Sequence, residues 1–283
     1  MTGVREQILD RAKSRVVAAN GLRHRVLTFA GGERELVFVP GITSPAETAE
    51  FLAEALPQFT VHVPDLRGRG RTDRPPAGAY TMNHYRKDLA GIIASLELDD
   101  PIVVGHSLGA RIVADWTASE SWTGAPVVLV DPPLSGPGRP YPMSARSFAR
   151  QLSEAREGTT AEKVRQYFPA WPERELRLRA ELLHECDETA VLETHRGFEE
   201  EEFLPTWARV RGCLGLIRGG NSPVVTPDDV AELERRNPGV PVIGVADAGH
   251  MVPWDNLPGF VVALRSLVTD ETDENHSHER TAP

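Results

Sequence analysis

Short apolar runs recur along the first half of the chain, and segments of helical periodicity separate most of them. Residues 15–18 and 22–29 flank Asn20-Gly21, a dipeptide that readily adopts the positive φ angles of a tight hairpin turn, so the pattern predicts an opening hairpin. Alternation of strands and helices then predicts a mostly parallel sheet covered on both faces. The predicted strands are 35–39, 60–64, 102–104 and 127–130, and the helices between them are 46–56, 82–96 and 110–118.

This alternation stops after residue 138. Residues 139–205 contain segments of helical pattern and no convincing strand, and two strands follow at 213–217 and 240–245. The sequence therefore predicts an α/β core (1–138 and 206–269) with a helical cap (139–205) inserted between two late strands. The acidic stretch 270–283 is nearly free of apolar residues and is predicted to be disordered. The cap helices are predicted at 144–156, 161–168, 173–185 and 188–197, and the last core helices at 227–236 and 257–268.

Composition narrows the partners. The 283 residues are 40% hydrophobic with a net charge of −10, which is ordinary for a globular chain and argues against nucleic acid or an anionic membrane as a partner. Cys186 and Cys213 have no metal-ligand spacing, and no apolar run reaches membrane-spanning length. We expect a cytoplasmic protein that needs no metal and no cofactor. Both a monomer and a homo-oligomer are compatible with the sequence.

The strongest motif is Gly105-His106-Ser107-Leu108-Gly109, which lies between a buried strand and a helix. In a strand–turn–helix of this kind the glycines allow close backbone approach, and the serine hydroxyl is exposed above the sheet. The motif predicts that Ser107 is a nucleophile. His106 is expected to be a structural part of the turn.

A serine nucleophile needs a base, and the base needs an acid to orient it. His250 lies in segment 246–254, which directly follows the last predicted strand, and is the best candidate base. The loop after strand 213–217 contains Asn221 where a carboxylate would be wanted. Asp131, which ends the strand at 127–130, is the favoured acid, and Asp228 at a helix start is the alternative.

Two backbone N–H groups should stabilise the oxyanion. One belongs to Leu108, the residue after the nucleophile, and the other to a loop after an earlier strand. Pro40 has no N–H, so the second donor is expected at Ile42.

Substrate contacts are weaker predictions. Arg111 lies one helical turn after Ser107 and is a candidate cation for a substrate carboxylate, with an ion pair to Asp115 as the equal alternative. The arginines at 67, 69 and 71 are more simply interpreted as solvated loop charges. Trp171, Met251 and Trp254 are candidate pocket residues.

Together these motifs resemble the N-formylmaleamate deformylases, a group within the α/β-hydrolases. The discriminating stretches are Gly41-Ile42-Thr43-Ser44-Pro45, Asp65-Leu66-Arg67-Gly68-Arg69-Gly70, Asp131-Pro132-Pro133-Leu134-Ser135-Gly136, and Ala248-Gly249-His250-Met251-Val252-Pro253-Trp254-Asp255, with the cap segment 178–186 also similar. In that family the acid follows the strand after the elbow helix, which corresponds to Asp131.

The resemblance implies an α/β-hydrolase fold and a serine hydrolase that cleaves the C–N bond of a small anionic amide, such as N-formylmaleamate, giving maleamate and formate. A related group hydrolyses acylaminomethylene succinates. A carboxylesterase or lactonase with the same three residues stays open, as does a cofactor-free oxygenase or a small-molecule receptor on the same fold.

Overall fold

The computed structural model describes residues 4–268 and contains an eight-stranded sheet in the order β1-β2-β4-β3-β5-β6-β7-β8. The first two pairings, β1 with β2 and β2 with β4, are antiparallel, and all others are parallel. The predicted mostly parallel sheet is thus confirmed. Its strands are β1 (Ala12–Ala19), β2 (Leu22–Phe29), β3 (Arg34–Val39), β4 (Phe59–Pro64), β5 (Ile102–His106), β6 (Val127–Val130), β7 (Cys213–Gly219) and β8 (Val242–Val245).

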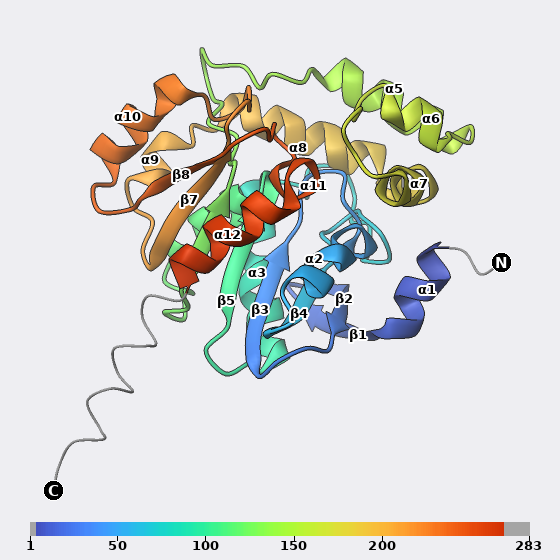
Figure 1. The fold of residues 1–283 in the computed structure, drawn as a ribbon, viewed down its shortest axis with the longest axis horizontal. Coiled ribbons are helices and arrows are strands. Elements are labelled where there is room, and N and C mark those ends of the chain that lie inside the picture. Colours follow the sequence, from blue (N-terminus) through green and yellow to red (C-terminus); the bar gives the residue numbers. More distant parts are fainter. Residues whose placement is uncertain (1–3, 269–283) are drawn as a thin grey trace, which may run out of the picture.

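Helices cover both faces of this sheet (Figure 1). Along β3, Val37 belongs to the core on one face, and Leu36 and Phe38 belong to the core on the other, because successive side chains of a strand point in opposite directions. Burial on both faces explains the continuous apolar runs of the sequence. The first face is covered by α3 (Met82–Leu96), α4 (Leu108–Thr117) and α10 (Pro227–Arg236), and the second by α2 (Glu50–Ala55) and α12 (Leu257–Val268).

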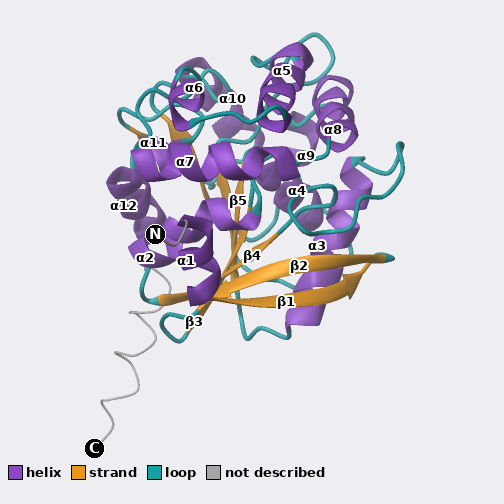
Figure 2. Cartoon of the chain, turned by 90° about the vertical axis from the view of Figure 1, so that its right-hand side faces the viewer, coloured by secondary structure: helices purple, strands orange, loops and turns teal. Residues whose placement is uncertain are grey.

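The segment between β6 and β7 is helical, as predicted. Figure 2 shows its helices above one end of the sheet, the end at which the parallel strands finish. The boundaries of a separate cap at 139 and 205 stay a prediction, and the tail at 270–283 lies outside the described residues. The helices of this segment, called the cap below, are α5 (Ala145–Arg156), α6 (Ala161–Arg165), α7 (Glu173–Leu182), the 3₁₀ turn η2 (Leu183–Glu185), α8 (Glu188–Glu200) and α9 (Leu204–Trp207).

A few boundaries differ from the predictions. Helix α6 ends at Arg165 instead of 168, because the residue before Pro169 is disfavoured in the helical conformation. The helix predicted at 46–56 begins as a 3₁₀ turn, η1 (Ala46–Ala49). Two short helices were not predicted, α9 and α11 (Val252–Asp255), since four residues are too few to show periodicity.

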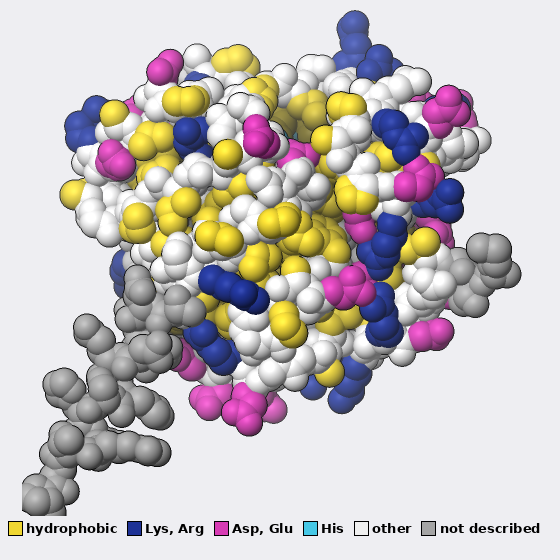
Figure 3. Space-filling view, viewed as in Figure 1, with side chains coloured by type: hydrophobic (Ala, Val, Ile, Leu, Met, Phe, Trp, Pro, Cys, Tyr) yellow, Lys and Arg dark blue, Asp and Glu magenta, His cyan; other side chains and the backbone are white. Residues whose placement is uncertain are grey.

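The N-terminal helix α1 (Val4–Arg11) connects the core and the cap through ion pairs. Arg11 binds Glu50 and Glu54 of α2, and Arg174 of α7 also binds Glu50. Arg5 bridges the buried Glu47 at 3.3 Å and Glu185 of the cap at 2.8 Å. Figure 3 shows basic and acidic side chains interspersed on this side of the molecule.

Candidate active site

The turn that carries Ser107 is closely packed. A Cβ atom on Gly109 would lie 1.9 Å from the carbonyl oxygen of Val39, and one on Gly105 would lie 2.4 Å from the carbonyl oxygen of Gly109. Both positions therefore require glycine, as the motif predicted. Ser107 itself has φ 55° and ψ −116°, a strained conformation of the kind that aims a side chain at functional sites.

Loops from three strands bring the predicted residues together. His250 Nδ1–H donates to Asp131 Oδ2 at 2.8 Å, and the Ser107 hydroxyl donates to His250 Nε2 at 2.9 Å. Because the carboxylate accepts from Nδ1, Nε2 is left as the acceptor for the serine proton. The structure thus joins the hydroxyl, the imidazole and the carboxylate in one hydrogen-bonded chain, the geometry that the predicted nucleophile, base and acid require.

Asp131 is fully buried, and two further donors hold its carboxylate. The Gly219 N–H donates to Oδ1 at 3.2 Å and the Ser222 hydroxyl donates to Oδ2 at 2.5 Å. The loop after β7 thus supplies hydrogen-bond donors to the acid instead of supplying the acid. Asp228, the alternative, is exposed at the start of α10, where its neighbour Asp229 forms the capping box with Thr226.

His106 holds the backbone of His250 in place through a hydrogen bond. Its Nε2–H donates to the carbonyl oxygen of His250 at 2.9 Å, and its Nδ1 is buried with no hydrogen-bond partner among residues 4–268. Burial, together with the nearby His250 ring, lowers the pKa of His106 to about 3, so the ring is neutral. This agrees with the structural part expected for His106.

Tyr141 is a residue that the sequence reasoning missed. Its hydroxyl lies 3.2 Å from His250 Nε2, on the loop between β6 and α5. Burial, and to a lesser extent the charge of Asp131, raise the pKa of Tyr141 well above its usual value, so the hydroxyl keeps its proton and is a donor.

The predicted oxyanion donors lie on the loop after β3 and at the start of α4. Within the described chain neither the Ile42 nor the Leu108 N–H donates to another protein group, and both residues are buried. The β3 loop lies close to the nucleophile, since a Cβ on Gly41 would be 3.5 Å from Ser107 Cβ. Arg69 fixes this loop by donating from Nε to the Ile42 carbonyl at 3.0 Å.

The prediction that the loop arginines are solvated is wrong for Arg67 and Arg69, because both side chains are buried. Arg67 pairs with Asp88 at 2.5 Å. Arg69 donates to the hydroxyl of Tyr85 at 2.6 Å as well as to the Ile42 carbonyl. Their contribution is to hold the loops around the site.

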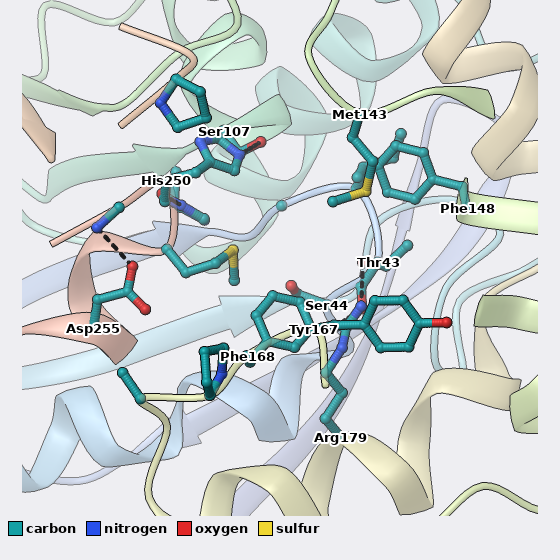
Figure 4. A pocket seen from close by; sticks show the side chains of 18 of the residues that line it. Thr43, Ser44, Ser107, Met143, Phe148, Tyr167, Phe168, Arg179, His250 and Asp255 are labelled. Carbon is teal, nitrogen blue, oxygen red and sulfur yellow. Dashed lines mark hydrogen bonds between the residues drawn. The ribbon is translucent and has the colours of Figure 1, made fainter. Parts of the chain in front are cut away.

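Ser107 and His250 line a cavity of about 400 Å³ between the core and the cap (Figure 4). Its wall is largely aromatic and apolar. Met251 is one of the lining residues, and its contact with substrate stays a prediction. The cavity is also lined by Gly41, Ile42, Thr43, Ser44, Tyr141, Met143, Phe148, Tyr167, Phe168, Arg179, Asp247 and Asp255.

The two predicted tryptophans lie behind this wall. Trp254 packs its ring 5.3 Å from that of His106. Trp171 stacks on Phe168 at 4.2 Å and donates from Nε1 to Asp255 at 3.1 Å. Both are buried and neither lines the cavity, so they support residues that do.

Arg111 does not lie in the cavity, which corrects its prediction as a substrate cation. It is buried beneath the far end of α8, where it donates to the carbonyls of Pro133 and Ser135, at 3.4 and 3.3 Å, and to that of Glu201. The alternative ion pair with Asp115 is not formed either, because Asp115 pairs with Arg86 at 3.0 Å. Helix α4 directs this side chain toward the base of the cap.

The cation that does line the cavity is Arg179 of α7. Figure 4 shows it reaching toward Thr43, the residue after the predicted oxyanion donor. Sequence spacing could not place it, because its position depends on how α7 packs over the core. The resemblance of segment 178–186 to the deformylases was the one signal.

No helix among residues 4–268 is long and apolar enough to cross a membrane. In the same part of the chain, no three histidine, cysteine, aspartate or glutamate side chains are grouped so that they could hold a metal ion.

The fold and site define the class: the chain belongs to the α/β-hydrolase family, whose model matches residues 36–264. It is therefore a hydrolase of the α/β-hydrolase fold. It is 38% identical to the N-formylmaleamate deformylase of Pseudomonas putida over 88% of this chain and 93% of that protein. The crystal structure of the N-formylmaleamic acid deformylase of Pseudomonas putida S16 superposes with a TM-score of 0.83, at 38% identity, over 89% of this chain and 100% of that chain.

A second relative is more distant. The 2-(acetamidomethylene)succinate hydrolase of Mesorhizobium japonicum is 31% identical over 77% of this chain and 81% of that protein. A crystal structure of an E-2-(acetamidomethylene)succinate hydrolase has a TM-score of 0.71, at 25% identity, over 91% of this chain and 99% of that chain.

Proposed function

We propose that this chain is a serine amidohydrolase that cleaves the C–N bond of a small N-acyl amide bearing a carboxylate, with N-formylmaleamate as the substrate and maleamate and formate as the products. The observation that carries the proposal is the hydrogen-bonded chain from Ser107 through His250 to Asp131, of which Ser107 and His250 line the cavity. The likeness to the deformylase of Pseudomonas putida supports the choice of acyl group.

In the first half of the reaction Ser107 Oγ attacks the formyl carbon while His250 Nε2 takes the hydroxyl proton. The Ile42 and Leu108 N–H groups stabilise the oxyanion, and Asp131 stabilises the imidazolium. Collapse of the tetrahedral intermediate breaks the C–N bond, and the Nε2 proton moves to the departing nitrogen. Maleamate leaves, and a formyl ester stays on Ser107.

In the second half a water molecule attacks the formyl ester, and His250 Nε2 takes its proton. The bond to Ser107 Oγ breaks, the proton returns to the serine, and formate is released. The departing nitrogen of N-formylmaleamate is conjugated to a second carbonyl, so it is a better leaving group than an ordinary amine. This matches a site whose proton donor to the leaving group is His250.

The test is formate release from N-formylmaleamate by the purified chain, followed by NMR. We expect Ser107→Ala to lower turnover by at least roughly a thousandfold. Efficient turnover of simple esters or lactones without formate release would favour an esterase or lactonase. Oxygen uptake, or ligand binding without turnover, would favour an oxygenase or a receptor.

The acylaminomethylene succinate hydrolase activity is a second candidate, because a relative of that name is 31% identical. A parallel assay for released acetate from 2-(acetamidomethylene)succinate compares the two. The cytoplasmic location and a homo-oligomer stay predictions from the sequence.

A further inference from the structure

Arg179 is a buried cation without an anionic partner. Its residue exposure is 5%, and it comes from α7 of the cap to line the cavity that contains Ser107. Among the described residues that line this cavity, it is the one lysine or arginine. Its environment therefore determines which charge the cavity can accept.

Apart from the Phe168 ring, whose centroid lies 4.8 Å from Arg179 Cζ, this guanidinium contacts three hydrogen-bond acceptors. Nη1 donates to the Thr43 carbonyl at 3.3 Å, and Nη2 donates to the Thr43 hydroxyl at 3.2 Å and to Gln151 Oε1 at 3.4 Å. All three acceptors are neutral, and Nε is buried with no partner among the described residues. An arginine has five N–H donors, and a buried charge without an anion is costly.

Two other buried arginines of the described chain have carboxylate partners, whereas Arg69 and Arg111, which bind neutral acceptors only, lie outside the cavity. Arg25 binds Glu47 and Asp65 at 2.6 and 2.5 Å, and Arg67 binds Asp88 at 2.5 Å. No carboxylate of the described residues lies within ion-pair distance of Arg179. Burial lowers the pKa of Arg179 to about 10, which still leaves it charged at neutral pH.

The position of Arg179 suits a short substrate. Thr43, which accepts two of its hydrogen bonds, follows the predicted oxyanion donor Ile42 directly in the chain. Figure 4 shows Arg179 and the pair Ser107 and His250 at separate parts of the same cavity. One small molecule can thus present its acyl group to the serine and an anionic end to the arginine.

The other charged side chains of the lining are acidic. Asp255 is held by the Gly249 N–H at 2.9 Å and by Trp171, and Asp247 is exposed at the rim. A second negative charge on a ligand would therefore meet these carboxylates without a second cation to bind it.

We infer that Arg179 binds the single carboxylate of the substrate, and that the cavity selects monocarboxylate amides over dicarboxylate amides. Maleamates have one carboxylate and succinate derivatives have two, so this inference separates the two candidate substrate classes. The selection among amide substrates rests on the proposed function. The binding of a carboxylate by Arg179 does not depend on it.

The kinetic test compares N-formylmaleamate with N-formylmaleamide, in which a neutral amide replaces the carboxylate. Arg179→Gln should raise KM for the anionic substrate by roughly 100-fold, the usual effect of removing one partner of a buried charge pair. The same variant should change kcat/KM for the neutral analogue less than about threefold. Arg179→Lys should recover part of the loss, since it keeps the charge but not the planar fork.

Arg111→Lys is the matched control, because Arg111 is also buried and cationic but lies outside the cavity. It should affect the anionic and neutral substrates equally. Circular dichroism verifies that each variant is folded. Equal losses on both substrates in Arg179→Gln, or no loss, would overturn the inference.

A binding measurement separates this inference from the proposed function. In Ser107→Ala protein, isothermal titration calorimetry should detect the binding of maleamate. The dicarboxylate 2-(acetamidomethylene)succinate should bind at least roughly tenfold more weakly. Arg179→Gln in the same background should abolish maleamate binding. If the wild-type chain releases no formate but this pattern holds, the reaction fails and the anion site stands; if the dicarboxylate binds as well as maleamate, the anion site as proposed is wrong.

Discussion

Two hydroxyl groups compete for one nitrogen at the centre of the site. Ser107 and Tyr141 lie 2.9 and 3.2 Å from His250 Nε2, and a neutral imidazole has one lone pair there. When Nε2 takes the serine proton it becomes a donor, and the Tyr141 hydroxyl loses its acceptor. That hydroxyl is then available to the departing nitrogen, where negative charge develops as the C–N bond breaks.

We therefore expect Tyr141→Phe to lower kcat for N-formylmaleamate by about tenfold, at nearly unchanged KM. The loss should be much smaller for p-nitrophenyl esters, because p-nitrophenolate departs without a proton. Steady-state kinetics on the two substrates measures the difference. Equal losses on both would mean that Tyr141 only packs against His250.

The two acids considered from the sequence give a second pair of variants. In Asp131→Asn the side chain can no longer stabilise the imidazolium, and an amide nitrogen facing His250 favours the wrong tautomer, so kcat should fall by roughly a thousandfold or more. Asp228→Asn, on the surface of α10, should leave kcat within about twofold of wild type. The reverse result would assign the acid to Asp228.

At this scale, the sequence could predict only what a local motif determines. Ser107 and its flanking glycines form such a motif. Asp131 comes directly after β6 and His250 lies in the loop after β8, so sheet topology brings them together. Arg111 was assigned to the cavity because it lies one turn from the nucleophile. Its side chain instead reaches the carbonyls below α8, and which side it faces depends on tertiary packing that spacing does not encode.

Strands and helices were predicted more accurately than side-chain positions. Helices α3, α10 and α12 and strand β6 have the bounds that periodicity indicated. Each is an apolar or amphipathic segment bounded by polar or turn residues, so local and tertiary preferences agree. The predictions failed where an element is only a few residues long, as in α9 and α11, or where a proline shortens it, as in α6.

Gly109 and Gly197 both lie in helices but differ in the space around them. Gly109, at the start of α4, has the Val39 carbonyl 1.9 Å from its potential Cβ, whereas Gly197 in α8 has open space there. Gly109→Ala should lower the free energy of unfolding by about 2–3 kcal/mol, because the elbow and β3 must move apart. Gly197→Ala should raise it by about 0.5–1 kcal/mol, since it removes only backbone entropy of the unfolded chain.

Urea denaturation of both variants measures these changes, and activity gives an independent check. Displacement of the elbow should also reduce turnover in Gly109→Ala, whereas Gly197→Ala should keep wild-type turnover. A neutral Gly109→Ala would show that the close approach of α4 to β3 is not required.

At the scale of the whole molecule, the cap completes the site that the core begins. The core supplies Ser107, Asp131 and His250 from strand ends, and the cap supplies Arg179 and most of the aromatic wall. Ion pairs from Arg5 and Arg174 join α1, the core and the cap beside this site. The extent of the cavity thus depends on the packing of two segments that are separate in the sequence.

The free energy of unfolding should depend on pH in the acid range, because His106 is buried in the native protein. Its ordinary pKa is 6.5, and burial beside His250 lowers the native value to about 3. Between these values the unfolded chain binds a proton that the native chain does not, so stability is lost as pH falls. One such group contributes about 1.4 kcal/mol of lost stability per pH unit within that window.

His106→Gln removes this titration and can still donate to the His250 carbonyl. We expect its free energy of unfolding to fall less steeply than that of wild type below about pH 6.5, with slopes that differ by up to about 1.4 kcal/mol per pH unit. Urea denaturation at several pH values between about 7 and about 5 gives both slopes, and carboxylates common to the two proteins cancel in their difference. The neutral-pH stability of the variant does not affect the comparison, because only the slope reports the proton. Parallel curves would mean that the native and the unfolded chain take up the His106 proton at the same pH, which would contradict the lowered pKa.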